Sequence, residues 1–418
     1  MFLLPDIMKA FELGEAGKVL VVKQNGKISA IGAKCTHYGA PLEKGALGEG
    51  RVRCPYHGAC YNIATGDIED YPGLDSLPCF QVEIKKDGGV KVRARKEDVK
   101  SRPAGLCCAE TLRQEGFKGR VVLVCKEPNL PYDRIKLSKS LDISIEKVLL
   151  RPAEFYKDPR MEAAAFCVSK AKSVTVIGRD EVPFRPVLGE EIGARILKFF
   201  KEKGVEFKMN SGIESIIASS SESDKVGEVK LTTGETLPAD IVILGVGATP
   251  NTNFLEASGL KLNQQGYVIV NNFLETNLKG VFAGGDIAFA PVLQTHASIG
   301  HWGLAHYHGR IAGLNMVGKK TELKSVPFFW TMLFGVGIRY AGYAPKFTDI
   351  VIEGSVEDMK FVAHYVQDGR VAAVATINWE PVAANYAEFL ISGNQICEQD
   401  LQPDPLAWAK QLNHLVSA

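Results

Sequence analysis

The sequence has almost no net charge and no long hydrophobic segment. Its 418 residues contain 49 Lys+Arg and 48 Asp+Glu, a formal net charge of +1, which gives no general field for nucleic acid or an anionic membrane. The longest apolar run, residues 328–338, contains two glycines and is shorter than the roughly 18–20 residues of a membrane-spanning helix. With 46% hydrophobic residues, the chain is predicted to form roughly two to four globular domains and no transmembrane segment.

The sequence also has few features of a secreted protein. Residues 1–17 lack the basic region and the small-residue cleavage site of a signal peptide, and they contain acidic residues that transit peptides avoid. The nine cysteines are odd in number and irregularly spaced, and a chain of this length does not need disulfides to fold. We therefore expect a reducing compartment, either cytoplasmic or mitochondria-associated.

The hydrophobic patterns predict a multi-domain chain in three parts. Residues 1–97 resemble a small all-β domain, because 18–32 and 79–94 each read as two strands around a turn, at Asn25-Gly26 and Asp87-Gly88. Residues 98–326 have the α/β pattern of Rossmann-like units. Helices are expected at 104–117, 160–172 and 190–204, and buried strands at 120–127, 173–181 and 239–248. Residues 327–418 are expected to form an α+β domain, with a helix at 381–393.

Two pairs of metal-ligating side chains lie close together in the first part, as Cys35-x-His37 and Cys54-x-x-His57. Two Cys and two His suit a tetrahedral zinc ion, a [2Fe–2S] cluster with the cysteines on one iron and the histidines on the other, or ordinary core packing. Zinc fingers pair Cys with Cys and His with His, whereas here each pair is mixed. Two loops that bind a two-iron cluster need this mixture, because each loop supplies one ligand to each iron.

The same stretch resembles the Rieske [2Fe–2S] signature, with Gly39, Pro41-Leu42 and Gly58 in its tight loops. The resemblance implies that Cys35 and Cys54 bind one iron and that His37 and His57 bind the other.

Two departures from the Rieske pattern are informative. Ala40 and Tyr56 occupy the positions of the disulfide found in respiratory Rieske proteins, and Ala59 replaces a serine that donates a hydrogen bond to a bridging sulfide. Fewer donors predict a low-potential, ferredoxin-like cluster. Cys60 and Cys79 are interpreted as buried packing residues.

A second group of motifs lies in the α/β region. An apolar run ends in Gly284-Gly285-Asp286 and resembles the second flavin motif of FAD/NAD-linked reductases, and residues 130–142 and 239–256 follow the order of that family. Together with the Rieske-like stretch, these motifs make the whole chain similar to the apoptosis-inducing-factor-like oxidoreductases that carry a Rieske domain.

The resemblance implies a role for each matching residue. Lys139 and His301 are the candidate catalytic residues, and His301 and Trp302 begin a helix whose positive end would face the flavin. The implied FAD-binding residues are Gly105, Glu127, Arg134, Lys139, Gly285, Asp286 and Trp302. His306 and His308 are interpreted as packed or solvated residues of the same helix.

Both nucleotide-binding units lack the glycine-rich loop that brings backbone amides to a pyrophosphate. Only Gly105 survives in the first unit, and Arg160 stands at the third glycine of the NAD-like unit, residues 160–237. Internal segments therefore look absent relative to the family. Two hypotheses follow. One is an NAD(P)H-dependent FAD oxidoreductase that passes electrons through the cluster to an unknown acceptor, with a homodimer formed through the C-terminal domain. The other is a catalytically impaired form, acting as a Rieske electron carrier or interaction module.

Overall fold

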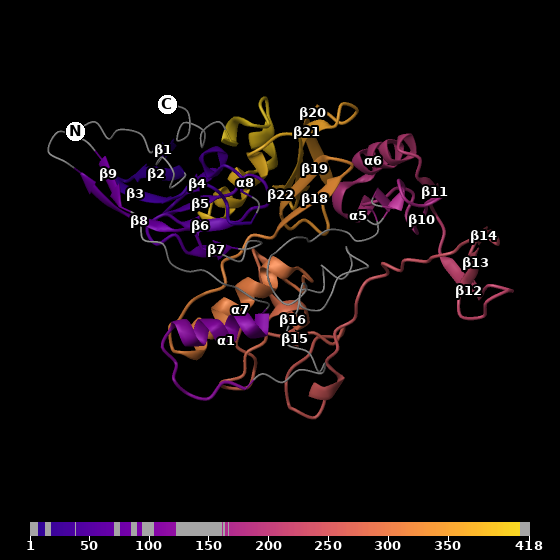
Figure 1. Cartoon of the computed structure of the whole chain (residues 1–418), viewed down its shortest axis with the longest axis horizontal. Coiled ribbons are helices and arrows are strands. Elements are labelled where there is room, and N and C mark those ends of the chain that lie inside the picture. Colours follow the sequence, from indigo (N-terminus) through magenta and orange to yellow (C-terminus); the bar gives the residue numbers. More distant parts are fainter. Residues whose placement is uncertain are drawn as a thin grey trace.

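The computed structural model describes residues 7–12, 18–37, 39–70, 76–84, 90–93, 104–122, 161, 164–165 and 167–409. The all-β N-terminal part lies beside the C-terminal sheet and its helix, and both lie above a helix pair from the middle of the chain (Figure 1). Among the described residues, no helix combines the length and hydrophobicity needed to span a membrane.

The N-terminal domain consists of two antiparallel sheets. The first has the order β1-β2-β3-β8-β9, with β1 (Ile7–Glu12), β2 (Lys18–Gln24), β3 (Lys27–Gly32), β8 (Cys79–Ile84) and β9 (Val90–Arg93). The second has the order β4-β5-β6-β7, with β4 (Ala46–Gly48), β5 (Arg51–Arg53), β6 (Cys60–Asn62) and β7 (Ile68–Asp70). A short 3-10 helix, η2 (Leu42–Lys44), precedes β4.

Both predicted strand pairs of this domain form. Asn25 and Gly26 both have positive φ, of 51° and 76°, as a tight two-residue hairpin turn requires. Strands β8 and β9 pair antiparallel, although their predicted turn at Asp87-Gly88 lies outside the described residues. The two sheets enclose an apolar core that includes Leu20, Ile31 and Val52.

The α/β region contains only short pieces of parallel sheet within its described residues. Strand β10 (Thr175–Ile177) pairs parallel with β11 (Glu206–Lys208), and β15 (Val268–Ile269) pairs parallel with β16 (Ala288–Val292). The remaining pairings are antiparallel and involve β12 (Ile213–Ala218), β13 (Val226–Leu231), β14 (Thr236–Pro238) and β17 (Thr295–Ala297). The β12–β14 sheet stands apart at one end of the molecule (Figure 1).

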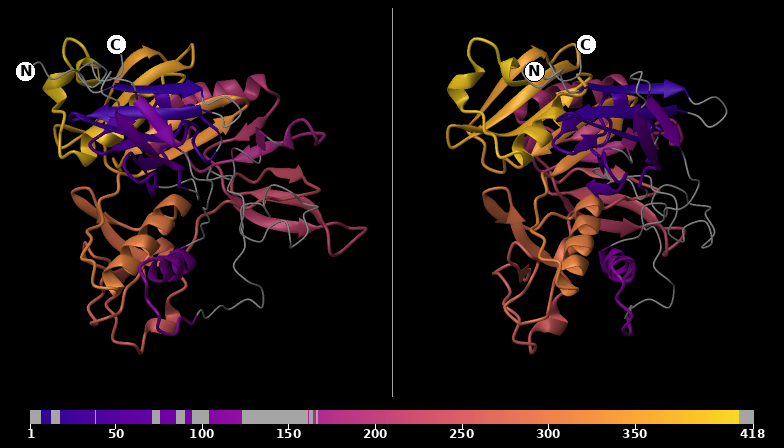
Figure 2. Two further views of the ribbon diagram at one scale, coloured as in Figure 1. Left: turned by 60° about the vertical axis from the view of Figure 1, so that its left-hand side comes forward. Right: turned by 90° about the vertical axis from the view of Figure 1, so that its left-hand side faces the viewer.

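The helices of this region follow the predicted pattern. Helices α5 (Arg185–Leu188) and α6 (Glu190–Glu202) connect β10 to β11, and α6 buries Ile192, Ile196 and Phe200. Helix α1 (Ala104–Gln114) lies along α7 (Trp302–Met316) in all views (Figures 1 and 2). The contact is close, because a Cβ on Gly313 would lie 2.9 Å from Thr111 Cβ. The 3-10 helices are η3 (Asn253–Leu255) and η4 (Gly285–Ile287).

One predicted strand of this region is wrong. Residues 239–248 do not form a strand, and their apolar side chains face solvent: Ile241 is 78% exposed, Ile243 58% and Val246 81%. A buried parallel strand needs partner strands and covering helices on both faces, and none of the described elements covers this segment. Of the strand predicted at 120–127, residues 120–122 form no strand and the others lie outside the described residues. The predicted helix at 160–172 is present at Met161, 164–165 and Cys167.

The C-terminal domain is an antiparallel sheet covered by a helix. The sheet order is β18-β19-β22-β21-β20, with β18 (Phe328–Leu333), β19 (Val336–Gly342), β20 (Asp349–Ser355), β21 (Lys360–Gln367) and β22 (Arg370–Ile377). Helix α8 (Val382–Ile391) and the 3-10 helix η5 (Glu398–Leu401) follow it. The predicted helix is confirmed, and Asp368-Gly369 turns between β21 and β22.

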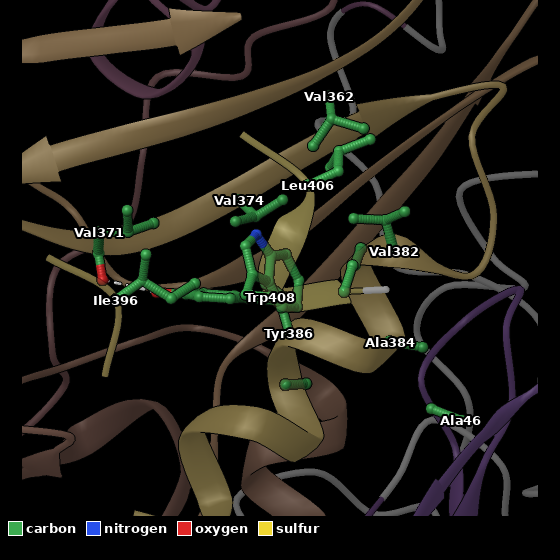
Figure 3. Close-up of a cluster of buried hydrophobic side chains, with 14 of the residues drawn as sticks. Ala46, Val362, Val371, Val374, Val382, Ala384, Tyr386, Ile396, Leu406 and Trp408 are labelled. Carbon is green, nitrogen blue, oxygen red and sulfur yellow. Dashed lines mark hydrogen bonds between the residues drawn. The ribbon is translucent and has the colours of Figure 1, made fainter. Parts of the chain in front are cut away.

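The core of this domain extends to the first domain. Tyr386 and Trp408 lie at its centre, and Ala46 of β4 belongs to the same buried cluster. Figure 3 shows Ala46 on its strand next to Ala384 of α8. The N-terminal and C-terminal domains, far apart in sequence, therefore share packed apolar surface.

Candidate metal centre and nucleotide site

Two loops of nearly identical backbone carry the four candidate ligands. In the first, the Cys35 N–H donates to Ala40 O at 2.9 Å and the Gly39 N–H donates to Cys35 O at 2.8 Å. In the second, which joins β5 to β6, the Cys54 N–H donates to Ala59 O at 2.7 Å and the Gly58 N–H donates to Cys54 O at 3.2 Å. Each loop therefore closes a turn of the same length, starting at its cysteine.

The glycine in each loop is a conformational requirement. Gly39 and Gly58 have φ of +69° and +74°, a region that other residues rarely adopt. Gly58 is constrained a second time, because a Cβ there would lie 2.5 Å from the ring of Phe328.

The loops bring like ligands together as two pairs. Nδ1 of His57 lies 3.0 Å from Nδ1 of His37, and the thiols of Cys35 and Cys54 are within hydrogen-bonding reach of each other. Within the described residues, no three His, Cys, Asp or Glu side chains surround a single ion position. A two-iron cluster divides four such ligands into two pairs, one on each metal.

Burial shifts the pKa values of these side chains. Cys35 and Cys54 are buried, and desolvation together with the neighbouring thiol raises the pKa of Cys54 well above its usual value, so two thiolates need a cation between them. Burial lowers the pKa of His37 to about 4, which keeps its imidazole neutral, as metal binding requires.

Hydrogen-bond donors approach both sulfurs. The Tyr61 hydroxyl lies 3.2 Å from Cys35 Sγ, and the backbone amides of Tyr56 and His57 hydrogen-bond Cys54. Tyr61 is a donor that the sequence argument missed, so the expected loss of donors at Ala59 is only partial. The interpretation of Cys60 as buried is confirmed, and that of Cys79 is wrong, because Cys79 is exposed with its thiol donating to Ala64 O at 3.1 Å. No disulfide occurs among the cysteines in the described part of the chain.

Strand β18 of the C-terminal domain covers the second loop. The Trp330 ring lies over the imidazole of His57, with a centroid separation of 3.7 Å and an interplanar angle of 35°. His57 is only 7% exposed as a result. Phe329, which alternates to the opposite face of β18, meets His301 at 4.9 Å between ring centroids. One strand thus separates the metal loop from the start of α7.

The flavin-like motif lies at that helix start. Helix α7 begins at Trp302 with His301 as its N-cap, as predicted. Asp286 lies in η4 next to this end, since a Cβ on Gly300 would be 3.8 Å from its carboxylate. The Gly285 N–H donates to His308 Nδ1 at 3.1 Å, so His308 is a packed residue, as interpreted. His306 is also fully buried.

Other predicted residues of the flavin site lie outside the described residues, namely Glu127, Arg134 and Lys139. Gly105 falls on helix α1. The described residues hold only the part of a flavin site around Gly285, Asp286 and His301, and residues 239–248 form no strand and are open to solvent. They therefore do not complete an FAD site.

Three family profiles divide the chain. Residues 3–81 match the Rieske [2Fe-2S] domain, residues 161–309 the pyridine nucleotide-disulphide oxidoreductases, and residues 328–411 the reductase C-terminal domain. The chain is therefore a Rieske protein fused to a pyridine-nucleotide reductase.

Whole-chain relatives narrow this class. Apoptosis-inducing factor 3 of Mus musculus and that of Homo sapiens are each 37% identical over 509 residues, covering 94% of this chain and 83% of the relative. The chain belongs to the apoptosis-inducing factor 3 family. Its members are oxidoreductases that couple FAD and NAD(P)H to a Rieske [2Fe–2S] centre. The fold also matches the crystal structure of the covalent putidaredoxin reductase–putidaredoxin complex, with a TM-score of 0.64 and 20% identity over 74% of this chain and 95% of that chain.

The alignment with these relatives contains a large internal difference. The 94% of 418 residues that align, about 393, are spread over 509 positions, so at least about 116 positions of the relatives have no counterpart here. Internal segments of the family are absent from this chain, as the interrupted glycine loops indicated.

Proposed function

We propose that this chain binds a [2Fe–2S] cluster through Cys35, Cys54, His37 and His57 and transfers single electrons, while the NAD(P)H-to-flavin half of the family reaction is impaired. The observation that carries the first part is the matched pair of loops, which set Cys beside Cys and His beside His. The observation that carries the second is the solvent-exposed apolar segment at 239–248.

The protein would supply hydrogen-bond donors and a buried, covered environment to such a cluster. The cluster itself would accept and release one electron at a time. The Tyr61 hydroxyl and the backbone amides of Tyr56 and His57 direct positive dipoles at the cysteine sulfurs, which favours the added negative charge of the reduced state. Burial of the loops and the cover by Trp330 shield His57 from water.

The flavin half has no glycine-rich loop in its sequence, and its described residues form no continuous parallel sheet. Neither nucleotide-binding unit has a glycine-rich loop in its sequence, so the amides that would face a pyrophosphate are missing. Parallel pairing among the described strands is limited to β10–β11 and β15–β16. Asp286 and the α7 N-terminus survive as one side of the site.

The alternative is the complete family reaction, in which NAD(P)H reduces FAD and the cluster passes the electrons to an acceptor. Two retained features favour it, namely Asp286 and the start of α7 at His301. The roles that the resemblance implies for Lys139 and Gly105 favour it as well. In either case we propose a reducing compartment, cytoplasmic or mitochondria-associated, and a soluble ferredoxin-type acceptor. A homodimer formed through the C-terminal domain is proposed by analogy with the reductases.

Electron paramagnetic resonance of the chain after anaerobic purification and dithionite reduction tests the cluster. We expect a Rieske signal that disappears in Cys54→Ser and persists in the matched control Cys79→Ser, because Cys79 is exposed and is not one of the four proposed ligands. A wild-type chain that binds only zinc and shows no Rieske signal would refute the proposal.

A further inference from the structure

Two arginines, one from each domain, donate hydrogen bonds to backbone carbonyls of the second ligand loop, residues 54–59. Arg339 of β19 donates from Nε to Tyr56 O at 2.9 Å, and it forms an ion pair with Glu380. Arg53 of β5 donates from a terminal nitrogen to Gly58 O at 2.8 Å. Each carbonyl therefore accepts a charge-assisted hydrogen bond, which is stronger than a neutral one.

Arg53 is itself held by a carboxylate of the C-terminal domain. Oε1 of Glu388, on α8, accepts from Arg53 Nε at 2.6 Å, and Oε2 accepts from Arg51 Nε at 2.7 Å. The Cys60 thiol points to the same carboxylate at 3.7 Å. Arg53 is 0% exposed and Glu388 4%. Charges so deeply buried are tolerated only when paired, and removing one partner leaves the other uncompensated.

The carboxylate has almost no freedom to move. A Cβ added at Gly48 of β4 would lie 2.0 Å from Glu388 Oε2, so the absence of a side chain there makes room for the carboxylate. Ala46, on the same strand, belongs to the apolar cluster that contains Ala384 and Tyr386 of α8 (Figure 3). Apolar packing and the ion pairs therefore hold the N-terminal and C-terminal domains in a fixed relative position.

The held carbonyls belong to the part of the loop that contacts the cysteine sulfur. The carbonyl of Tyr56 and the N–H of His57 are two ends of one peptide group, and that N–H hydrogen-bonds Cys54. Because a peptide group is planar, Arg339 fixes the direction of the N–H by fixing the carbonyl. Arg53 fixes the other end of the same loop at Gly58. Hydrogen bonds to cluster sulfurs set the potential of iron–sulfur centres.

We propose that Glu388 is a positioning residue for the iron–sulfur cluster, acting through Arg53 on the second ligand loop, so that the C-terminal domain sets the redox potential of the N-terminal domain. The inference rests on the cluster of the proposed function. Glu388 contacts no ligand directly, and it acts by orientation and by balancing two arginine charges near the metal. Loss of its negative charge leaves these arginines less neutralised, which favours the more negative, reduced cluster.

The test compares full-length Glu388→Gln with Glu357→Gln, which removes the same charge from an exposed glutamate of the same domain. Iron content, midpoint potential and the g values of the reduced cluster are measured for each. We expect Glu388→Gln to retain iron, to shift the midpoint potential upward and to move the g values, with Glu357→Gln unchanged. A midpoint potential and g values equal to those of wild type in Glu388→Gln would overturn the proposal.

Gly48→Ala covers the case in which Glu388→Gln loses iron or fails to fold. This variant displaces the carboxylate without changing any charge, so a shift of its g values supports the positioning role, and unchanged g values and potential overturn it. A wild-type chain without a Rieske signal would instead refute the proposed function.

Discussion

His57 lies against the Trp330 ring of the C-terminal domain at 3.7 Å between ring centroids, whereas His37 meets the same ring edge-on at 6.1 Å. His57 is also the proposed ligand at which a substitution changes the charge most simply. In His57→Cys a thiolate would add negative charge at the iron, so we expect the variant to keep iron and its midpoint potential to fall by on the order of 100 mV or more. Potentiometric titration followed by optical spectra measures this. An unchanged or raised potential would show that His57 is no ligand.

The buried His364 of β21 makes the stability of the protein sensitive to acid pH. It is 0% exposed, its Nδ1 lies 3.3 Å from Val351 O, and its Nε2 accepts from Trp408 Nε1 at 3.2 Å. Burial lowers its pKa from 6.5 to about 4, against the raising effect of the Val351 carbonyl. The stability it contributes is therefore complete above pH 6.5 and is lost as the pH falls toward 4.

One proton taken up on unfolding costs about 1.4 kcal/mol per pH unit. We expect urea unfolding between pH 7 and pH 5 to show a shallower loss of stability in His364→Gln than in wild type. Glutamine still offers an acceptor to Trp408 and a donor to Val351. The exposed His296→Gln should keep the wild-type slope. Equal slopes in His364→Gln and wild type would exclude this role.

Residue-level prediction succeeded where the signal is local. The four candidate ligands lie within 23 positions of one another, and their spacing with the glycines indicated two equivalent loops. Tyr61, a buried tyrosine seven residues after Cys54, is a signal that was open to sequence reasoning and was missed. Trp330, Arg339 and Glu388 could not be found, because they meet the loops only through tertiary packing across more than 270 positions.

At the scale of elements, residues 239–248 show the largest difference between predicted and observed burial. Its Ile and Val residues predict a buried strand, yet Ile243 is 58% exposed and Val246 81%. We expect Ile243→Lys combined with Val246→Lys to change the free energy of unfolding by less than about 0.5 kcal/mol each, as for ordinary surface positions. The urea midpoint measures this.

The same substitution at a buried position provides the contrast. Ile196 of α6 is 0% exposed, and Ile196→Lys should prevent folding or cost several times more than the double variant, because it buries an unpaired charge. Strong destabilisation by the Ile243 and Val246 changes would mean that this segment is covered in solution.

Elements with self-contained signals were predictable. The hairpins at Asn25-Gly26 and Asp368-Gly369 and the amphipathic helix α6 carry their instructions in the turn residues and in the spacing of apolar side chains. Strand β18 was missed, since 328–338 reads as a single apolar run, which the structure divides at Phe334-Gly335, both with positive φ. Segment 239–248 was mispredicted because strand burial depends on neighbours that a local pattern cannot supply.

Across the whole molecule, the N-terminal and C-terminal domains pack against each other, whereas the sequence of the middle region lacks segments of the family. The N-terminal domain contacts β18 and α8 through ring stacking, ion pairs and apolar packing. Helix α7 contacts the N-terminal domain too, with Arg310 donating to Ile68 O at 3.1 Å. By contrast, at least about 116 aligned positions of the family are absent from the interior.

The absent glycine loops have an energetic consequence for FAD. Each charge-assisted hydrogen bond from a backbone amide to the pyrophosphate contributes roughly 1.5–3 kcal/mol. Losing two or three of them weakens binding by roughly 3–9 kcal/mol, about two to six decades in affinity. Asp286 and the start of α7 remain, but they do not supply these backbone amides.

The ratio of flavin to iron in the purified full-length chain tests this account most directly. Acid-released FAD and total iron are measured on the same sample, together with NADH and NADPH oxidation. We expect full iron occupancy with a Rieske spectrum, little or no FAD, and NAD(P)H oxidation near background that returns when the two glycine-loop segments of the family are inserted. One tightly bound FAD per chain, with NAD(P)H turnover, would contradict it.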